Sequence, residues 1–243
     1  MATEVFIRHE KKYRMDEHTF TRLKERLSGF LEADAHNKEN GGAYTIQNIY
    51  YDTENSDFIR HSLEKPAYKE KLRLRSYGTP GTDSTVYAEI KKKVRGVVNK
   101  RRSGMRLSEA YSFLESGELP ALRPYMNAQV LREITYMLER NTLKPALFLS
   151  YDRVAFSDGK KSDLRVSFDT NIRSRLSDLK LESGVHGKPI LPDGEVIMEI
   201  KTNQSIPLWL CSLLSEYRIY PASFSKYGAV FRQLLERNLC LAA

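Results

Sequence analysis

Several stretches of this chain alternate charged and apolar residues, and this period of two constrains the fold more than any other feature of the sequence. Neighbouring side chains of a strand point to opposite faces, so each stretch would carry one apolar face and one charged face. In one stretch, for example, Leu72 and Leu74 alternate with Lys71, Arg73 and Arg75. The pattern predicts a sheet with a hydrophobic face and a basic face, and a polyanion as the ligand of the basic face.

The charged residues of these stretches are mostly cations, with a few carboxylates among them. They are Arg8, Glu10, Lys12 and Arg14, then Lys71, Arg73 and Arg75, then Glu89, Lys91 and Lys93, then Arg153, Arg165 and Asp169, and finally Glu195, Glu199 and Lys201. Unpaired charges are costly where water is scarce. The carboxylates would therefore offset part of the cationic charge, and a bound polyanion would offset the rest.

Hydrophobic periodicity and turn residues divide the chain into strands and helices. The predicted strands cover 5–14, 44–51, 68–77, 85–94, 97–106, 145–157, 163–173 and 195–202. The first predicted helix follows Asp16, a typical N-cap residue. Further helices are predicted at 54–63, 206–218 and 226–239. Much of 108–140 is also predicted to be helical, with a last helix near 127–140. Eight strands are about the number at which an antiparallel sheet closes into a barrel. We therefore predict a single α+β domain over residues 1–243, an eight-stranded antiparallel β-barrel with a basic lumen and flanking helices.

Composition limits the classes of ligand and the cellular compartment that can be expected. A formal net charge of +8 favours an anionic partner, such as phosphate, nucleotide, nucleic acid or an acidic membrane surface. Cys211 and Cys240 are the two cysteines, so we expect neither a disulfide framework nor a cysteine metal site, and we expect a reduced, cytoplasmic setting. The N-terminal residues lack the apolar h-region of a signal peptide, so we expect no secretory leader, and no apolar run reaches the length of a membrane span.

Several familiar catalytic motifs fail in this sequence. The segment 184–188 resembles a Walker loop, but its spacing is too short, and Pro189 stands where Ser or Thr would hold magnesium. The histidines do not cluster, and a nucleophile elbow is missing. Any chemistry is therefore expected to depend on the placement of charges.

Arg73 and Arg75 are the sharpest candidates for an anion site. Two guanidinium groups on one strand face lie roughly 6 to 7 Å apart, which matches successive phosphates of a chain. The alternative is a solvated edge strand, where cations discourage aggregation. Because crowded cations repel one another, we expect alanine at both positions to leave the thermal stability intact or higher. Basic residues of matching parity on the next two strands support the anion site; they are Lys91, Lys93, Lys100 and Arg102.

Two further candidates have equally plain alternatives. Glu199 and Glu10 lie among cations, and carboxylates near phosphates commonly bind Mg²⁺ or Mn²⁺, although internal ion pairs would explain them as well. Lys226 begins the last predicted helix, with Ser225 as a possible cap. A helix N-terminus favours anions, but an ordinary capping turn would look the same.

Short motifs recur in order over residues 5–235. They are RHEKKY (8–13), IYYDTE (49–54), KLRLRSYG (71–78), YAEIKKK (87–93), YDRVAF (151–156), LRVSFDT (164–170), VIMEIKTN (196–203) and FSKY (224–227). Together they resemble the VTC catalytic domain, a branch of the triphosphate tunnel metalloenzymes. The specificity of this resemblance lies in the combination, because no single motif is distinctive.

The resemblance implies an antiparallel tunnel that binds triphosphate. It also implies the activity of a polyphosphate polymerase, which moves the γ-phosphate of ATP to a growing polyphosphate chain and releases ADP. This reaction uses a divalent metal, often manganese. Carried over by motif, the phosphate ligands are Lys12, Arg73, Arg75, Lys91, Lys100, Arg153, Arg165 and Lys226, the metal ligand is Glu199, and Lys201 and Ser225 assist. The full prediction assigns catalysis to Arg73, Arg75, Lys12, Arg153 and Lys226, substrate binding to Lys91, Lys93, Lys100, Arg102, Arg165, Lys201, Ser225 and Arg8, and Mn²⁺ or Mg²⁺ to Glu199, Glu10 and Glu89.

One departure bears on the choice within the superfamily. Triphosphatase branches open with Glu-x-Glu-x-Lys, whereas this chain has Arg8 in place of the first glutamate, which favours the polymerase branch. Regulation or membrane coupling is expected to come from another polypeptide, such as a membrane protein. The competing predictions are a metal-dependent triphosphatase or polyphosphatase and a polyphosphate-binding module without turnover. Nucleic acid is disfavoured, because single-strand binders interleave exposed aromatic residues with their cations.

Overall fold

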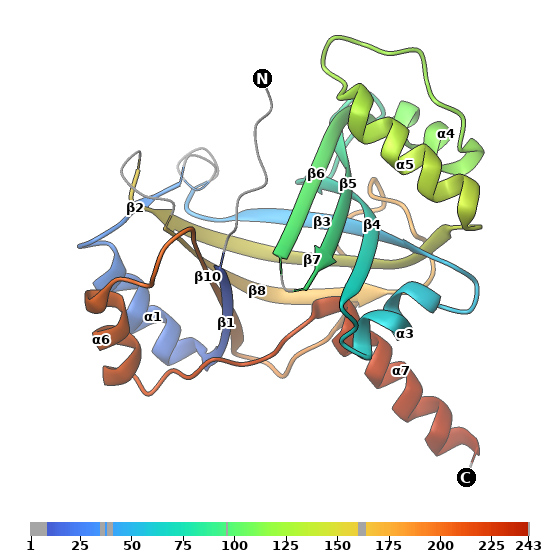
Figure 1. The fold of residues 1–243 in the computed structure, drawn as a ribbon. Coiled ribbons are helices and arrows are strands. Elements are labelled where there is room, and N and C mark those ends of the chain that lie inside the picture. Colours follow the sequence, from blue (N-terminus) through green and yellow to red (C-terminus); the bar gives the residue numbers. More distant parts are fainter. Residues whose placement is uncertain (1–8, 35–36, 38–40, 96, 160–163, 243) are drawn as a thin grey trace. The chain divides into compact units, whose positions relative to one another are not determined.

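The computed structural model describes the chain except for residues 1–8, 35–36, 38–40, 96, 160–163 and 243 (Figure 1). The strands are β1 (His9–Asp16), β2 (Glu32–Ala33), β3 (Tyr44–Asp52), β4 (Tyr68–Tyr77), β5 (Thr85–Val94), β6 (Val97–Arg106), β7 (Lys144–Ser157), β8 (Arg165–Arg175), β9 (Lys188–Pro189) and β10 (Glu195–Thr202). The helices are α1 (Glu17–Leu27), α3 (Asp57–Leu63), α4 (Leu107–Ser116), α5 (Ala128–Arg140), α6 (Leu208–Glu216) and α7 (Lys226–Ala242). None of the described helices is long and apolar enough to cross a membrane.

The strands follow the order β1-β10-β8-β7-β3-β4-β5-β6, with β2 paired to β7 and β9 paired to β8. The registered pairs along this path are antiparallel. This arrangement confirms the predicted α+β class and the antiparallel sheet. Closure into a barrel would require β1 to pair with β6, and no such pairing occurs among the described residues, so the predicted closure is not observed.

Close contacts divide the chain into two compact units, and β3, β7 and β8 each contribute residues to both. Unit 1 comprises residues 1–45, 151–172 and 189–225, and unit 2 comprises residues 46–150, 173–188 and 226–243. Each unit has a hydrophobic core of its own.

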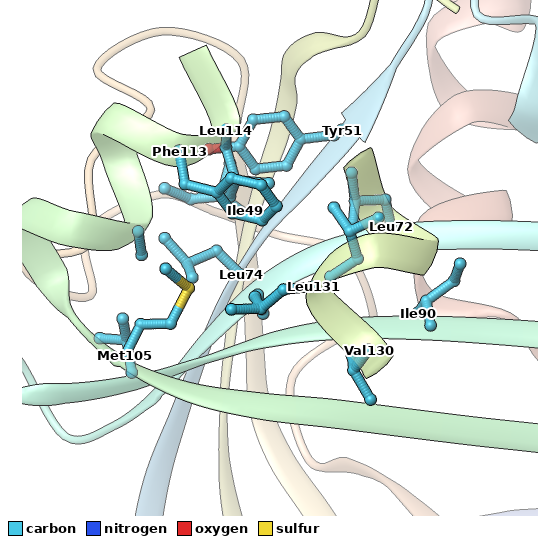
Figure 2. Packing of buried hydrophobic residues seen from close by; sticks show 14 of the residues in the cluster. Ile49, Tyr51, Leu72, Leu74, Ile90, Met105, Phe113, Leu114, Val130 and Leu131 are labelled. Carbon is cyan, nitrogen blue, oxygen red and sulfur yellow. The ribbon is translucent and has the colours of Figure 1, made fainter. Parts of the chain in front are cut away.

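The core of unit 2 lies between the apolar face of its strands and the helices α4 and α5 (Figure 2). Leu72 and Leu74 of β4 and Leu131 of α5 are completely buried there, and Phe113 of α4 is only 1% exposed. Burying a side chain of this size stabilises a fold by about 1.5–3 kcal/mol. The apolar parity predicted for β4 is therefore correct, and the cations of β4 belong to the opposite face.

The core of unit 1 repeats this arrangement with α1 and α6. Val166 and Phe168 of β8 and Met198 of β10 pack in one cluster with Leu23 of α1 and Leu210 of α6. The predicted cap of α1 is also confirmed, because the carboxylate of Asp16 accepts a hydrogen bond from the Thr19 amide at 2.7 Å. In both units, therefore, the charged side chains of the strands lie on the face opposite to the one that the helices cover.

Candidate functional site

The charged face of unit 2 is built by β4, β5 and β6. Arg73 pairs in register with Glu89, which pairs with Arg102. One step along the strands, roughly 7 Å away, Lys71 pairs with Lys91. Directly opposed residues of neighbouring strands share a face, so the register gathers the predicted cations of these strands on one surface. We call this surface the basic face; it consists of Lys71, Arg73, Arg75, Lys91, Lys93, Lys100 and Arg102.

Glu89 is the acidic residue at the centre of the basic face, and its side chain is only 1% exposed. Its Oε2 lies 2.7 Å from Arg73 Nη2 and 3.8 Å from Arg75 Nη1, and its Oε1 lies 2.8 Å from Lys100 Nζ. Burial alone would raise the pKa of Glu89, but these cations hold it below its ordinary value. A carboxylate surrounded in this way acts as a counter-ion, and a divalent cation would meet three positive charges there. The geometry therefore argues against the predicted metal role of Glu89.

The two arginines of β4 are also fixed by residues of β3. Arg75, with 7% of its side chain exposed, donates from Nε to Asn48 Oδ1 at 2.9 Å. Arg73 donates from Nη1 to the hydroxyl of Tyr50 at 3.1 Å. Burial would raise the pKa of Tyr50, but Arg73, Lys71 and Arg75 lower it to about 8. These contacts hold both guanidinium groups in defined positions.

The outer members of the basic face are less buried. Arg102 donates to the hydroxyl of Tyr77 at 3.3 Å and lies 4.5 Å from the centre of the Tyr87 ring. Lys91 and Lys93 are half-buried. The β4–β6 strands thus present strongly paired arginines at one end of a basic surface and more accessible lysines at the other.

Lys226 is the first residue of α7, directly after Ser225, and both side chains are half-buried. The next residue, Tyr227, has its ring 5.1 Å from that of Tyr50 and 5.9 Å from Lys71 Nζ. The first turn of α7 therefore lies next to the basic face. Arg8, another predicted ligand, falls outside the described residues.

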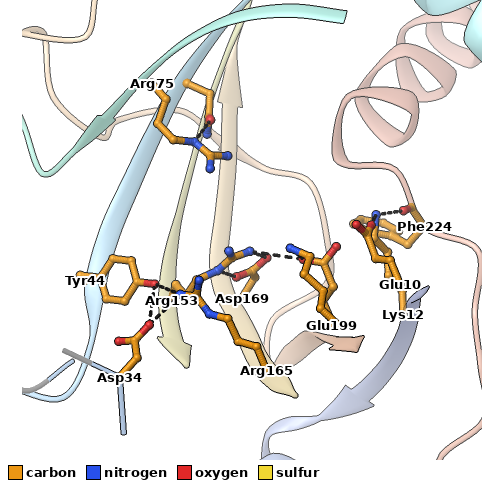
Figure 3. Close-up of polar contacts among 12 residues, drawn as sticks. Glu10, Lys12, Asp34, Tyr44, Arg75, Arg153, Arg165, Asp169, Glu199 and Phe224 are labelled. Atoms are coloured by element: carbon orange, nitrogen blue, oxygen red, sulfur yellow. Dashed lines mark hydrogen bonds and ion pairs between the residues drawn. The ribbon is translucent and has the colours of Figure 1, made fainter. Parts of the chain in front are cut away.

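The charged face of unit 1 carries a more even balance of signs (Figure 3). Arg153 of β7 binds Asp169 of β8 through Nε at 2.6 Å and Nη2 at 2.8 Å, and Asp169 is fully buried. Arg153 Nη2 also lies 3.8 Å from Glu199 Oε2. The bidentate pair fixes the guanidinium plane. It also neutralises much of the charge that a phosphate would need from Arg153.

Glu10 of β1 and Glu199 of β10 form a pair of carboxyl groups. Lys201 Nζ lies 3.0 Å from Glu199, and Lys12 Nζ lies 3.4 Å from Glu10. Burial would raise the pKa of Glu199, but Lys201, Glu10, Lys12 and Arg153 hold it well below its usual range. Lys12 Nζ also donates to the Phe224 carbonyl at 2.9 Å.

This pair fits a divalent ion better than Glu89 does. Two neighbouring carboxyl groups repel each other when both are ionised, and a shared cation relieves that repulsion. Magnesium sites commonly use one or two carboxylates, with water and phosphate oxygens as the remaining ligands. No cluster of three or more His, Cys, Asp or Glu side chains that could hold a metal occurs in the part of the chain that the structure describes. The ion pairs of Glu199 with Lys201 and Arg153 keep the alternative interpretation open.

Some polar residues of the site escaped prediction. Arg165 donates from Nη2 to Asp34 at 2.6 Å and to the hydroxyl of Tyr44 at 3.1 Å. Asp34 lies in a polar loop with no strand pattern, and Asn48 and Tyr50 belong to a strand that is buried on both faces. An alternating pattern could therefore not reveal them. The one available signal was the shared parity of Tyr44, Asn48 and Tyr50, which Ile46 interrupts.

Relatives of this chain match it over most of its length. The VTC domain family matches residues 7–235. Vacuolar transporter chaperone complex subunit 4 of Schizosaccharomyces pombe is 24% identical over 263 residues, covering 91% of this chain and 36% of that protein. Subunit 4 of Trypanosoma cruzi is 27% identical over 219 residues, covering 75% of this chain and 27% of that protein. The chain thus spans roughly a third or less of the length of these relatives.

Two solved structures share the fold. A candidate adenylate cyclase from Bacillus halodurans has a TM-score of 0.53 at 16% identity, covering 93% of this chain and 96% of its own. A candidate adenylyl cyclase from Hippeastrum with a dominant triphosphatase activity has a TM-score of 0.51 at 15% identity, covering 92% of this chain and 94% of its own. At such identities the likeness concerns the fold alone. The family match confirms the resemblance that the motifs indicated.

Proposed function

Because the chain belongs to the VTC domain family, we propose that it is a phosphoryl-transfer enzyme that acts on polyphosphate. In its specific form, the proposal is a polyphosphate polymerase, which transfers the γ-phosphate of ATP to a growing polyphosphate chain and releases ADP. Phosphoryl transfer needs positioning and neutralisation of charge more than it needs an acid or a base. A site made of fixed cations suits that requirement.

The basic face of unit 2 is the observation that carries this proposal. On that face, Glu89 is the one acidic residue of the described β4–β6 strands, and it shares the face with the seven cations that define it. Glu89 can neutralise one positive charge, so most of the cationic charge is left for an anion. Arg73 and Arg75 would bind neighbouring phosphates of ATP, and Lys91 and Lys93 would bind phosphates further along the strands.

The acceptor makes a general base unnecessary. The end of a polyphosphate chain is already ionised at neutral pH, so its oxygen can attack the γ-phosphorus without losing a proton first. The cations of the basic face would take up the charge that develops on the equatorial oxygens. This account is consistent with a site whose described contacts involve arginine, lysine, tyrosine and carboxylates.

Glu10 and Glu199 of unit 1 would bind Mn²⁺ or Mg²⁺. Such an ion would supply positive charge that offsets the charge of a bound phosphate. Lys201, Lys12 and Arg153 hold the pKa of Glu199 low against the effect of its burial, which would keep that carboxylate ionised for this task.

Hydrolysis of triphosphate or polyphosphate is the second candidate function. The same cations would hold the substrate while water replaces the polyphosphate acceptor, and the Hippeastrum protein of similar fold has triphosphatase activity. The names of the relatives, subunits of a vacuolar transporter chaperone complex, support a further proposal that this chain works with a membrane-protein partner. A cytoplasmic location stays a prediction.

Product analysis tests the proposal. Purified protein is incubated with ATP and Mn²⁺, with and without a short polyphosphate primer, and the products are separated on a gel stained for polyphosphate beside an assay for free phosphate. Long chains together with ADP are expected. Free phosphate without chains would move the assignment to a triphosphatase, and the absence of both products would contradict the enzymatic proposal.

A further inference from the structure

Asp52, the last residue of β3, is a fully buried carboxylate outside the set of predicted site residues. Its Oδ1 accepts hydrogen bonds from the amides of Thr53 and Phe58, each at 2.9 Å. Its Oδ2 accepts from the Ile59 amide at 3.1 Å and from the hydroxyl of Tyr227 at 2.9 Å. A buried carboxylate with four donors is well compensated, and each donor has a definite place in the fold.

Two of these donors, the amides of Phe58 and Ile59, show that Asp52 caps α3. The residue at the N-cap position, Ser56, has a left-handed backbone with φ 59°, and its side chain makes no capping hydrogen bond. Asp52 instead receives the amides of Phe58 and Ile59 in the first turn of α3. Free amides at a helix start need such an acceptor. Asp52 therefore joins the end of β3 rigidly to α3.

The hydroxyl of Tyr227 joins Asp52, and with it the end of β3 and the start of α3, to α7. Tyr227 is the second residue of α7, and burial and the neighbouring Asp52 raise its pKa, so its hydroxyl stays protonated and donates. One helical turn later, the Phe231 ring lies 5.5 Å from the guanidinium carbon of Arg60 in α3. Residues four apart share one face of a helix. The start of α7 is thus held at two successive turns, by Asp52 at the end of β3 and by Arg60 of α3.

The anchored turn lies beside the basic face. The Tyr227 ring is 5.1 Å from the ring of Tyr50, whose hydroxyl accepts a hydrogen bond from Arg73. Lys226 immediately precedes Tyr227 and is the residue of this turn that the family resemblance assigns to phosphate. First turns of helices fray readily unless other contacts hold them. A lysine on a frayed turn would lose entropy each time it bound a phosphate.

We propose that Asp52 and Tyr227 form a latch that holds the first turn of α7 in place and thereby positions Lys226 for the phosphate chain. Asp52 and Tyr227 are positioning residues in this proposal, since they act through Lys226. The effect on binding rests on the proposed function. The latch itself does not, because it concerns the stability of a helical turn in the protein alone.

Hydrogen exchange of the ligand-free protein tests the latch directly. Tyr227→Phe removes the hydroxyl and keeps the ring, so the amides of residues 227–231 are expected to exchange at least tenfold faster. The capped amides of α3 should keep their protection. Tyr136→Phe is the matched control, because Tyr136 is an exposed tyrosine of α5 and its loss should leave residues 227–231 unchanged. Unchanged exchange in Tyr227→Phe would overturn the latch.

A double-mutant cycle with tripolyphosphate tests the action through Lys226. Tyr227→Phe is expected to weaken binding about tenfold in the native background and less than twofold in the Lys226→Ala background, because coupled residues are not additive. Equal losses in both backgrounds would overturn the positioning role. If the native protein binds no tripolyphosphate, the proposed function fails, while hydrogen exchange still decides whether the latch exists.

Discussion

Arg73 holds one oxygen of Glu89 with two of its nitrogens, Nε at 2.8 Å and Nη2 at 2.7 Å. The arginine expected to bind phosphate is therefore already half engaged by an internal counter-ion. A phosphate would approach the donors that remain, and Glu89 would keep the guanidinium group oriented. This pairing changes what substitutions at the basic face are expected to do to stability.

Arg73→Ala should destabilise the fold by about 2–4 kcal/mol, because it leaves the buried Glu89 with fewer cations. This reverses the expectation, drawn from crowded cations alone, that stability would be kept or raised. Urea unfolding of Arg73→Ala, Glu89→Gln and the double variant measures the effect. The double variant should be more stable than Arg73→Ala alone. An Arg73→Ala protein as stable as the native one would contradict the role of Glu89 as counter-ion.

Tyr50 should make anion binding depend on pH. Arg73, Lys71 and Arg75 lower its pKa to about 8, while Tyr227 packs beside it. A bound phosphate would cancel part of that cationic field and raise the pKa of Tyr50 again. Binding then takes up a proton above pH 8, so the affinity for tripolyphosphate should fall, by up to about tenfold per pH unit. Titration calorimetry between pH 6.5 and pH 9.5 measures this.

Tyr50→Phe is the control for this pH dependence. It keeps the ring and removes the titrating hydroxyl, so the additional fall in affinity above about pH 8 should disappear. An identical slope in the two proteins would exclude Tyr50 as its source. For stability the sign is opposite: the lowered pKa contributes nothing below about pH 8, and its contribution grows until the ordinary tyrosine pKa near 10 is passed.

Glu199→Gln should abolish metal-dependent turnover while keeping the affinity for ATP within about tenfold. The cations around Glu199 remain in this variant, so phosphate binding should suffer little. Glu195→Gln is a suitable control, because Glu195 has the same parity on β10 and is paired with Arg14. Turnover is measured against Mn²⁺ concentration. Unchanged turnover in Glu199→Gln would remove Glu199 from the metal site.

Asp52→Ala should cost about 2–4 kcal/mol of stability, since it uncaps α3 and leaves buried donors without an acceptor. Asp83→Ala provides the comparison, because the Asp83 side chain is 80% exposed and such surface changes are usually within about 0.5 kcal/mol. Thermal and urea unfolding give both values. Equal stability of the two variants would show that Asp52 does not organise this region.

The strand pattern could be predicted closely because each strand of the basic face is buried on one side only. The bounds of β4, β5 and β6 coincide with the predicted ones, and their apolar parity is the more deeply buried one. The bounds of β10 in unit 1 coincide as well. The partners within the site could not be predicted. Asp34 and Arg165, for example, lie 131 residues apart in the sequence. Asp52 gave no signal either, because β3 is buried on both faces and lacks alternation.

The binding of tripolyphosphate by titration calorimetry tests most directly whether the basic face binds a chain of phosphates. Lys91→Ala with Lys93→Ala changes half-buried residues of that face and avoids Arg73 and Arg75, whose loss also affects folding. The account predicts a native affinity that falls with salt and decreases at least tenfold in this variant. Arg140→Ala with Lys144→Ala removes the same charge from exposed positions elsewhere in unit 2 and should bind within about twofold of native. Equal affinities of the two variants would contradict the account.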